Sequence, residues 1–162
     1  MKTEEYPVTQ AIRFLREKKV PFEAYQYVYE EHGGTGQTAL VLDVAEHDVI
    51  KTLVFESDDG ECFILLMHGD CEASVKELAR VLNVKRVQPS SEQKAMKFTG
   101  YQFGGTSPFG TKRPMRTFTE SSILDLNDIY INGGKRGFIL KVSTSDLKNV
   151  LNLLPVNVAI KK

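Results

Sequence analysis

The chain has 162 residues, of which 41% are hydrophobic and 26% charged, and its formal net charge is zero. These values are typical of a globular protein, and the length fits a single domain over residues 1–162. They argue against disordered and collagen-like chains, and no apolar run approaches the roughly 18 residues of a membrane span. Because the first residues also lack an apolar signal segment, we expect a cytoplasmic protein with no membrane contact.

Apolar periodicity and capping residues predict helices and strands that mix without regular alternation. In chain order, the predicted helices cover residues 10–19, 37–44, 72–82, 91–99 and 144–153. The expected N-caps are Thr9, either Ser90 or Ser91, and Thr144. The predicted strands cover 22–29, 49–55, 61–67, 85–88, 115–119, 129–132 and 137–142, with a further extended segment at 101–103. The run 61–67 is almost continuously apolar, so we expect that strand to be buried on both faces. Glycine-rich loops are predicted at 32–36 and 104–110, and hairpin turns at 57–60 and 133–134. No repeat or linker is present, so the pattern favours a mixed-sheet α/β or α+β domain.

The two halves of the chain differ sharply in charge. Residues 1–81 carry 8 basic and 16 acidic side chains, a net charge of −8, whereas residues 82–162 carry 13 basic and 5 acidic ones, a net charge of +8. One interpretation is a basic face that binds phosphates. The alternative is that the halves interleave in space and their charges mix.

The residues that usually carry protein-based catalysis are sparse. Cys62 and Cys71 are too few for a disulfide framework or a four-ligand zinc site of their own. The three histidines, His32, His47 and His68, lack metal-ligand spacing, and residues 68–71 are interpreted as a turn. The chain contains neither a Gly-x-Ser-x-Gly elbow nor a His-Glu-x-x-His motif. We therefore predict no metal site, no cofactor and no protein nucleophile.

Residues 104–110 form the most unusual segment, with three glycines, one proline and two hydroxyl side chains in seven residues. Such a loop can direct several backbone N–H groups at an anion or an oxyanion. Gly105 and Gly110 have the spacing of a phosphate-binding P-loop, but Thr111-Lys112 reverses the required order of its lysine and hydroxyl residue. A tight structural loop explains the same residues.

Two cationic positions have both a structural and a functional explanation. Gly133-Gly134-Lys135-Arg136-Gly137 predicts a hairpin turn whose two cations suit a phosphate or a carboxylate. Lys51 lies in an apolar strand, where alternation places it on the same face as Leu53 and Phe55. A lysine there needs an anion or a cavity, unless it reaches water from a frayed strand start.

Four segments, taken together, carry a more specific signal. They are Thr9-Gln10-Ala11-Ile12, Lys51-Thr52-Leu53, Thr99-Gly100-Tyr101-x-x-Gly104-Gly105-x-Ser107-Pro108-x-Gly110 and Gly133-Gly134-Lys135-Arg136-Gly137. In this combination the chain resembles the YbaK/EbsC family of aminoacyl-tRNA deacylases, relatives of ProX and of the editing domains inserted in synthetases. The resemblance spans about Thr9 to Leu151, and it is specific because of the combination rather than any single segment.

The resemblance implies a mixed α/β fold, like that of YbaK and of prolyl-tRNA synthetase editing domains, with helices flanking a central mixed, barrel-like sheet. It implies an enzyme that removes a wrong amino acid, typically cysteine and sometimes alanine, from proline tRNA. The family lysine maps onto Lys51, the glycine that helps to bind the ester carbonyl onto Gly104, and a tyrosine at the end of the first strand onto Tyr27. We therefore predict Lys51 and Gly104 as catalytic, and Lys135 and Arg136 as tRNA-binding. The predicted substrate-binding residues are Tyr27, Thr52, Gly105, Thr106, Ser107, Pro108, Asn132 and Gly134.

Three positions depart from the family pattern. Residues 33–36 replace an aromatic that often lines the pocket, Asn132 stands where serine is frequent, and Ile139 stands where some relatives have aspartate. These positions border the pocket, so they leave the amino-acid specificity open, with cysteine as the default.

The predicted function is a trans-editing deacylase with aminoacyl-tRNA as substrate and prolyl-tRNA synthetase as a candidate partner. An aminoacyl ester is already activated, so positioning and polarisation of the carbonyl supply much of the catalysis. For a cysteinyl ester, family chemistry lets the substrate's own thiol attack, which would make the reaction lyase-like rather than hydrolytic. Two alternatives stay open: a non-catalytic module that binds an RNA end or a nucleotide, and a regulatory partner of a synthetase.

Overall fold

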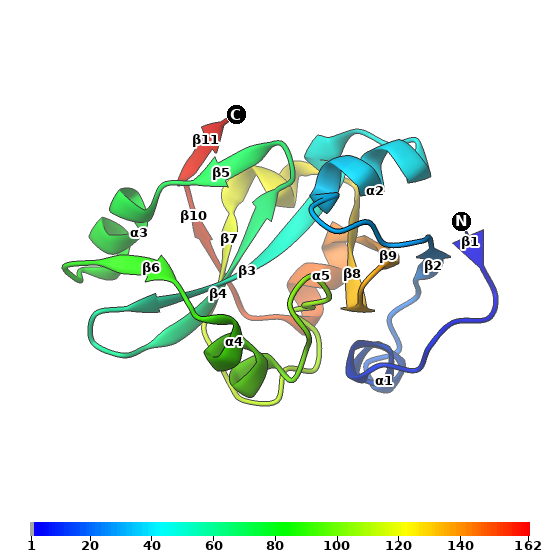
Figure 1. The fold of residues 1–162 in the computed structure, drawn as a ribbon, viewed down its shortest axis with the longest axis horizontal. Helices are drawn as coiled ribbons and strands as arrows, with labels where there is room; N and C mark the ends of the chain where they lie inside the picture. The colour runs from blue at the N-terminus through cyan, green and yellow to red at the C-terminus, as the bar shows by residue number, and fades with distance from the viewer. Residues whose placement is uncertain (1) are drawn as a thin grey trace.

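In a computed structural model, which describes residues 2–162, a curved sheet runs through the molecule and helices pack on both of its faces (Figure 1). The α-helices of this part of the chain are α1 (Gln10–Glu17), α2 (Gly34–Leu42), α3 (Val75–Leu82), α4 (Glu92–Thr99) and α5 (Thr144–Val150). Its strands are β1 (Lys2–Thr3), β2 (Glu23–Gln26), β3 (Val49–Ser57), β4 (Cys62–His68), β5 (Cys71–Ala73), β6 (Val87–Pro89), β7 (Thr117–Glu120), β8 (Asp128–Lys135), β9 (Phe138–Ser143), β10 (Leu153–Val156) and β11 (Ala159–Lys161). Short 3₁₀ helices, η1 (Glu46–Asp48) and η2 (Ser121–Asp125), precede β3 and follow β7.

The main sheet is mixed and has the strand order β1-β2-β9-β8-β3-β4-β7-β10, with β6 paired to the end of β3. The pairs β3/β8, β4/β7 and β7/β10 are parallel, and the other pairs are antiparallel. The prediction of a mixed α/β fold with a central mixed sheet flanked by helices is therefore confirmed. The order ends at β1 and β10, which form no ladder with each other within residues 2–162. A separate two-stranded ladder joins β5 to β11.

The two halves of the chain interleave in this sheet. Strands β2, β3 and β4 come from the acidic half, yet β2 pairs with β9, β3 with β8, and β4 with β7, all from the basic half. The charges of the halves are thereby mixed, so a basic face does not follow from chain position.

None of the helices within residues 2–162 combines the length and the apolar content needed to cross a bilayer.

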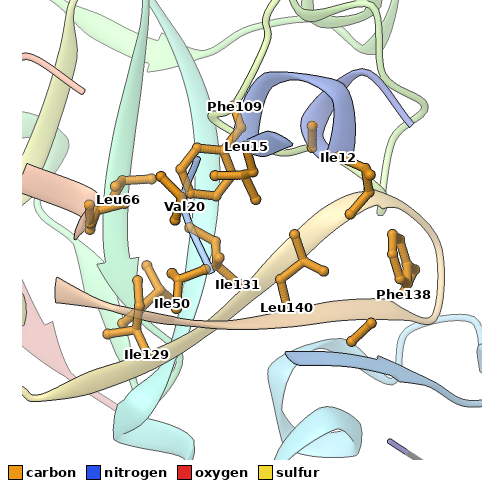
Figure 2. Packing of buried hydrophobic residues seen from close by; sticks show 14 of the residues in the cluster. Ile12, Leu15, Val20, Ile50, Leu66, Phe109, Ile129, Ile131, Phe138 and Leu140 are labelled. Carbon is orange, nitrogen blue, oxygen red and sulfur yellow. The ribbon is translucent and has the colours of Figure 1, made fainter. Parts of the chain in front are cut away.

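Two apolar clusters cover the two faces of the sheet. The larger one packs α1 against β3, β4, β8 and β9 (Figure 2). The residues of that cluster labelled in Figure 2 are Ile12, Leu15, Val20, Ile50, Leu66, Phe109, Ile129, Ile131, Phe138 and Leu140. The second cluster packs α3 against Phe55, Phe63, Leu65 and Met67 of β3 and β4. Every residue of β4 is buried, which confirms the sequence prediction of a strand covered on both faces.

Several local predictions are confirmed by the hydrogen bonds that cap helices. The Thr9 hydroxyl accepts the Ile12 N–H at 3.2 Å and caps α1. Ser91, one of two predicted candidates, caps α4, which ends at Gly100 with φ +80°. The last helix is capped by Ser143 rather than by the predicted Thr144, because the Ser143 hydroxyl accepts the Asp146 N–H.

The glycine-rich segment 32–36, predicted as a loop, is instead largely helical, because α2 begins at Gly34. Gly69 lies against the start of this helix, and a Cβ there would come within 2.7 Å of the Thr35 Cβ. Two backbones approach closely where Gly69 has no side chain, and this long-range contact has no signal in the local sequence.

The predicted turn at residues 133–134 is also wrong. Both glycines lie in β8, and the chain reverses at residues 136–137. The Asn132 Oδ1 accepts the N–H groups of Gly134 and Lys135, and the β8/β9 register shifts between Asn132 and Lys135. The glycines therefore serve a β-bulge rather than the hairpin turn.

The remaining errors concern short or truncated elements. The strand predicted at 22–29 covers only 23–26, and residues 101–103 are not a strand. The helix predicted at 72–82 begins at Val75, because Cys71–Ala73 pairs with β11, and the helix predicted at 144–153 ends at Val150, where the chain turns into β10. Strands β1, β5, β10 and β11 were missed because two to four residues are too few for alternation to be recognised.

Candidate active site

The candidate site lies where the parallel strands β3 and β8 separate. Their ladder ends with Ile50 opposite Ile131, and both side chains pack in the larger apolar cluster. Successive residues of a strand point to opposite faces. Lys51 follows Ile50 and Asn132 follows Ile131, so the side chains of Lys51 and Asn132 lie on the opposite face of the sheet, on two neighbouring strands. Two predicted site residues that are 81 positions apart in the chain thus both directly follow the end of this ladder.

The Lys51 ammonium group is anchored at this point. It donates a hydrogen bond to the Cys71 carbonyl oxygen at 2.5 Å, and the side chain is half-buried. Burial, assisted by the nearby positive charge of Lys162, holds the pKa of Lys51 below its ordinary value, although Glu72 opposes this shift. The lysine is therefore held in the fold rather than extended into water from a frayed strand start. An ammonium group has three N–H donors, so two are available for a phosphate or ribose oxygen.

The glycine-rich loop packs directly on the turn between β8 and β9. The Gly105 N–H donates to the Gln102 carbonyl at 2.8 Å, and a Cβ on Gly105 would lie 2.8 Å from the Arg136 backbone nitrogen. The Gly105 amide is thus already used within the loop. Gly104 differs: it is exposed, its φ is +85°, and its N–H makes no hydrogen bond within residues 2–162. Of the two predicted amide donors, only Gly104 is available to a carbonyl oxygen.

Arg136 holds the loop in place. Its Nε donates to the Phe103 carbonyl at 2.8 Å, and its guanidinium carbon lies 5.0 Å from the centroid of the Tyr29 ring. A Cβ on Gly104 would lie 2.9 Å from the Tyr29 hydroxyl and 3.2 Å from the Arg136 Nε. The Arg136 side chain therefore packs beside Gly104, whereas the adjacent Lys135 is exposed and makes no ion pair among the described residues.

Asn132 connects β8 to the loop. Its Nδ2 donates to the Gly104 carbonyl at 3.4 Å, while its Oδ1 accepts the N–H groups of Gly134 and Lys135 at 2.6 and 3.1 Å. A serine, frequent at this position in the family the chain resembles, is too short to span both contacts. The asparagine therefore couples the bulge in β8 to the position of Gly104.

Three other predicted substrate-binding residues are buried or hydrogen-bonded within the fold. Ser107 and Pro108 are buried, and the Ser107 hydroxyl accepts the Phe109 N–H at 3.3 Å. The Tyr27 hydroxyl is hydrogen-bonded to the Thr38 hydroxyl of α2 at 2.6 Å, and burial raises the pKa of Tyr27. These three side chains are engaged within the protein.

Three further predicted residues lie around the same strands. Gly134 has no room for a side chain, since a Cβ would meet the Tyr101 ring at 2.7 Å. Thr106 is partly exposed in the glycine-rich loop. Thr52 follows Lys51 on the opposite face of β3, and its Oγ1 is buried with no hydrogen-bond partner within residues 2–162.

Two features of this region were not predicted from the sequence. Tyr29 supports Gly104 and Arg136, and its spacing from Tyr25 and Tyr27 on alternate positions was the available signal. The histidines His47 and His68 were interpreted as scattered, yet their rings stack with centroids 3.6 Å apart. Chain spacing gives no signal for that contact, because His68 lies on β4 and His47 on the 3₁₀ helix η1.

The arrangement combines a desolvated cation, an amide side chain and one exposed backbone N–H at a strand end. These are groups that bind a phosphate or ribose and polarise a carbonyl. They suit a substrate that is already activated, such as an ester.

Comparison with known proteins agrees with this chemistry. The family described as "Aminoacyl-tRNA editing domain" matches residues 34–150. EbsC of Enterococcus faecalis, which is named as a Cys-tRNA(Pro)/Cys-tRNA(Cys) deacylase, is 26% identical over 145 residues, covering 89% of this chain and 88% of EbsC. The proline--tRNA ligase of Streptococcus equi subsp. equi is 34% identical over 104 residues, which is 64% of this chain but only 17% of the ligase.

The fold is likewise shared with solved structures. A protein described as a trans-editing enzyme for prolyl tRNA synthetase superimposes with a TM-score of 0.84 and 14% sequence identity, covering 98% of this chain and 99% of that one. At this identity the likeness concerns the fold. The family match, which covers most of the chain, confirms the family of aminoacyl-tRNA deacylases expected from the sequence motifs: the chain belongs to the aminoacyl-tRNA editing domain family.

Proposed function

We propose that the chain acts in trans as a deacylase that removes a wrong amino acid from mischarged tRNA, with cysteine on proline tRNA as the default substrate. The name of EbsC, whose sequence aligns with 89% of this chain, supports this substrate class. The match to proline--tRNA ligases supports proline tRNA as the tRNA of the substrate and makes prolyl-tRNA synthetase a candidate partner.

The observation that carries the proposal is the hydrogen bond from Asn132 to the Gly104 carbonyl, beside the end of the β3/β8 ladder that Lys51 directly follows. In this assignment Lys51 holds the terminal phosphate or the ribose of the tRNA. The Gly104 N–H binds the ester carbonyl, and Asn132 and Arg136 fix the position of Gly104. Lys135, which is exposed, contacts the nucleic-acid backbone.

The chemistry needs no nucleophile from the protein. The thiol sulfur of a cysteinyl ester attacks its own carbonyl carbon, the bond from that carbon to the ribose oxygen breaks, and the thiol proton passes to the ribose oxygen. An amino acid without a thiol is released by water instead. In both cases negative charge develops on the carbonyl oxygen, where a positioned N–H stabilises the transition state.

The test is deacylation measured across a panel of charged tRNAs. We expect Cys-tRNA(Pro) to be cleaved, Pro-tRNA(Pro) to be spared, and Ala-tRNA(Pro) and Cys-tRNA(Cys) to define the specificity. A non-catalytic binding module would bind tRNA saturably and cleave no member of the panel. A regulatory partner would change nothing until prolyl-tRNA synthetase is added. Either result would contradict the proposal.

A further inference from the structure

A second cluster of reactive side chains lies at the end of the sheet where β4 turns into β5. It comprises His47 of η1, Asp70 of the turn and Cys71 at the start of β5. The Nδ1 of His47 lies 2.9 and 3.1 Å from the two carboxylate oxygens of Asp70, and the Cys71 sulfur lies 3.5 Å from Oδ1. The three ligand atoms all lie within 4.8 Å of one another.

These distances are close to those of a tetrahedral metal site. Bond lengths of about 2.0–2.3 Å place a nitrogen and an oxygen ligand about 3.4 Å apart, and a sulfur about 3.6 Å from either. The sulfur–oxygen separation of 3.5 Å already fits, and the nitrogen–oxygen separation is within half an ångström. The sulfur and the His47 nitrogen, which are at most 4.8 Å apart, have to come closer, and the nitrogen and oxygen have to move slightly apart.

The protons of the cluster are also placed where a metal would replace them. The Cys71 S–H and the His47 ring both direct hydrogen bonds at the same carboxylate. A divalent cation would replace the two protons directed at Asp70: the thiol proton passes to solvent, and the imidazole proton resides on Nε2 of His47. The carboxylate and thiolate together balance the charge of the cation. A cysteine binds a metal ion as its thiolate, so loading releases the thiol proton.

Neighbouring groups fix the orientation of the His47 ring. It stacks on His68 with an angle of 7° between the two planes. His68 is 1% exposed, and its Nδ1 and Nε2 are hydrogen-bonded at 2.7 Å to the His47 carbonyl and the Ser122 hydroxyl, respectively. The hydrogen bonds of His68 thus hold the ring on which His47 stacks. The Lys51 ammonium is directed at the Cys71 carbonyl rather than at its sulfur.

We propose that His47, Asp70 and Cys71 form a binding site for a divalent transition-metal ion of the zinc class. The His47 and Asp70 side chains are 42% and 32% exposed, so an ion can enter from solvent and a water molecule can complete its coordination. The chain spacing of these residues does not match a zinc motif, which is why the sequence analysis predicted no metal. This site stands independently of the proposed deacylase function.

The test uses Co²⁺, whose spectrum reports ligands directly, on the full chain after treatment with a chelator. We expect saturable binding at pH 7.5, with the visible bands of tetrahedral cobalt, a near-ultraviolet charge-transfer band from the thiolate, and displacement by Zn²⁺. Cys71→Ser should abolish the charge-transfer band, whereas Cys62→Ser, which alters the other buried cysteine, should retain it. A wild-type protein without that band, or a band that survives in Cys71→Ser, would overturn the proposal.

Two further variants keep the test decisive if Cys71→Ser does not fold. His47→Phe retains a ring that can stack on His68 but offers no ligand, and Asp70→Asn retains the size of the side chain without its charge. Each should weaken Co²⁺ binding by about tenfold or more while the circular dichroism spectrum of the metal-free protein is unchanged. Unaltered affinity in both variants would exclude these residues as ligands.

Discussion

The Lys51 ammonium group lies 2.5 Å from the Cys71 carbonyl oxygen, so a residue of β3 is tied to the first residue of β5. Strand β5 pairs with β11, where Lys161 lies opposite Cys71. The lysine is thereby oriented by backbone that sheet pairing already fixes. Burial of an ammonium group disfavours its charged form, and one hydrogen bond to a carbonyl compensates only in part. The remaining cost of burying the charged ammonium group is reduced when an anion binds beside it, so Lys51 is well suited to bind an anion.

Lys51→Ala should lower deacylation of the preferred charged tRNA by about tenfold or more, because it removes the cation that positions the substrate. The melting temperature should change little, since the lost hydrogen bond is offset by the relief of burying a charge. Steady-state kinetics and thermal unfolding measure the two effects. Lys141→Ala, at another partly buried strand lysine, is the matched control and should keep full activity. Equal activity in both variants would contradict the role of Lys51.

The pH dependence of kcat/KM should show the lowered pKa of Lys51, because kcat/KM reports the free enzyme. Lysine titrates ordinarily near 10.5, and burial lowers this value. The contribution of Lys51 should therefore be complete below the lowered pKa and lost as pH rises through it, before 10.5 is reached. Burial of the charged form costs stability below the lowered pKa, and that cost disappears as pH rises.

The control for this profile is Lys51→Arg, because arginine stays charged throughout the range. The ratio of wild-type to Lys51→Arg activity, after subtraction of spontaneous ester hydrolysis, should fall with pH. A constant ratio up to 10.5 would show that Lys51 does not titrate early.

Gly104→Ala should abolish turnover while binding of uncharged tRNA is retained. The substitution places a Cβ 2.9 Å from the Tyr29 hydroxyl and adds strain at φ +85°, so the loop shifts and its N–H leaves the carbonyl. The strain itself should cost about 1–2 kcal/mol of unfolding free energy. Loss of an oxyanion donor typically lowers rates by about 100- to 1,000-fold.

Two variants separate these causes. Gly60→Ala has the same kind of strain at φ +92° but meets no atom within 4 Å, so it should lose stability without losing activity. Tyr29→Phe in the Gly104→Ala background removes the clashing hydroxyl and should restore part of the rate. A fully active Gly104→Ala protein would exclude the N–H of Gly104 as a carbonyl-binding group.

Sequence patterns predicted those parts of the molecule whose signals are local. The cap at Thr9 and the doubly buried strand β4 depend on neighbours within a few residues, and both are confirmed. By contrast, the first turn of α2 lies against Gly69, and the His47 ring stacks on His68 where η1 meets β4. Interactions of this kind join distant segments, so periodicity and spacing contain no trace of them.

The same distinction holds in the candidate site. The motifs containing Lys51 and Gly104 were recognised as segments, and the structure adds the hydrogen bond from Asn132 to Gly104 beside the end of the β3/β8 ladder. The sequence treated Lys135 and Arg136 as an equivalent pair of tRNA-binding cations, whereas only Lys135 is exposed. Arg136 is instead bonded to the Phe103 carbonyl and lies over Tyr29, contacts that no turn motif predicts.

This difference between adjacent cations leads to opposite expectations for their variants. Lys135→Ala should weaken tRNA binding with no change in stability. It should also reduce the slope of log affinity against log salt by about 0.7–0.9, which is the effect of one lost phosphate contact.

Arg136→Ala should lower the unfolding free energy by about 1 kcal/mol through the lost hydrogen bond to Phe103, and should reduce turnover more than binding because Gly104 is released. Arg136→Lys keeps the charge but not the planar contact with Tyr29, so it should retain the salt slope and still lose turnover. Affinity measured from 50 to 200 mM salt, together with melting temperature and single-turnover rates, distinguishes the two roles. If Arg136→Ala flattens the salt slope and leaves the rate constant of bound substrate intact, Arg136 is a phosphate contact and not a positioning residue.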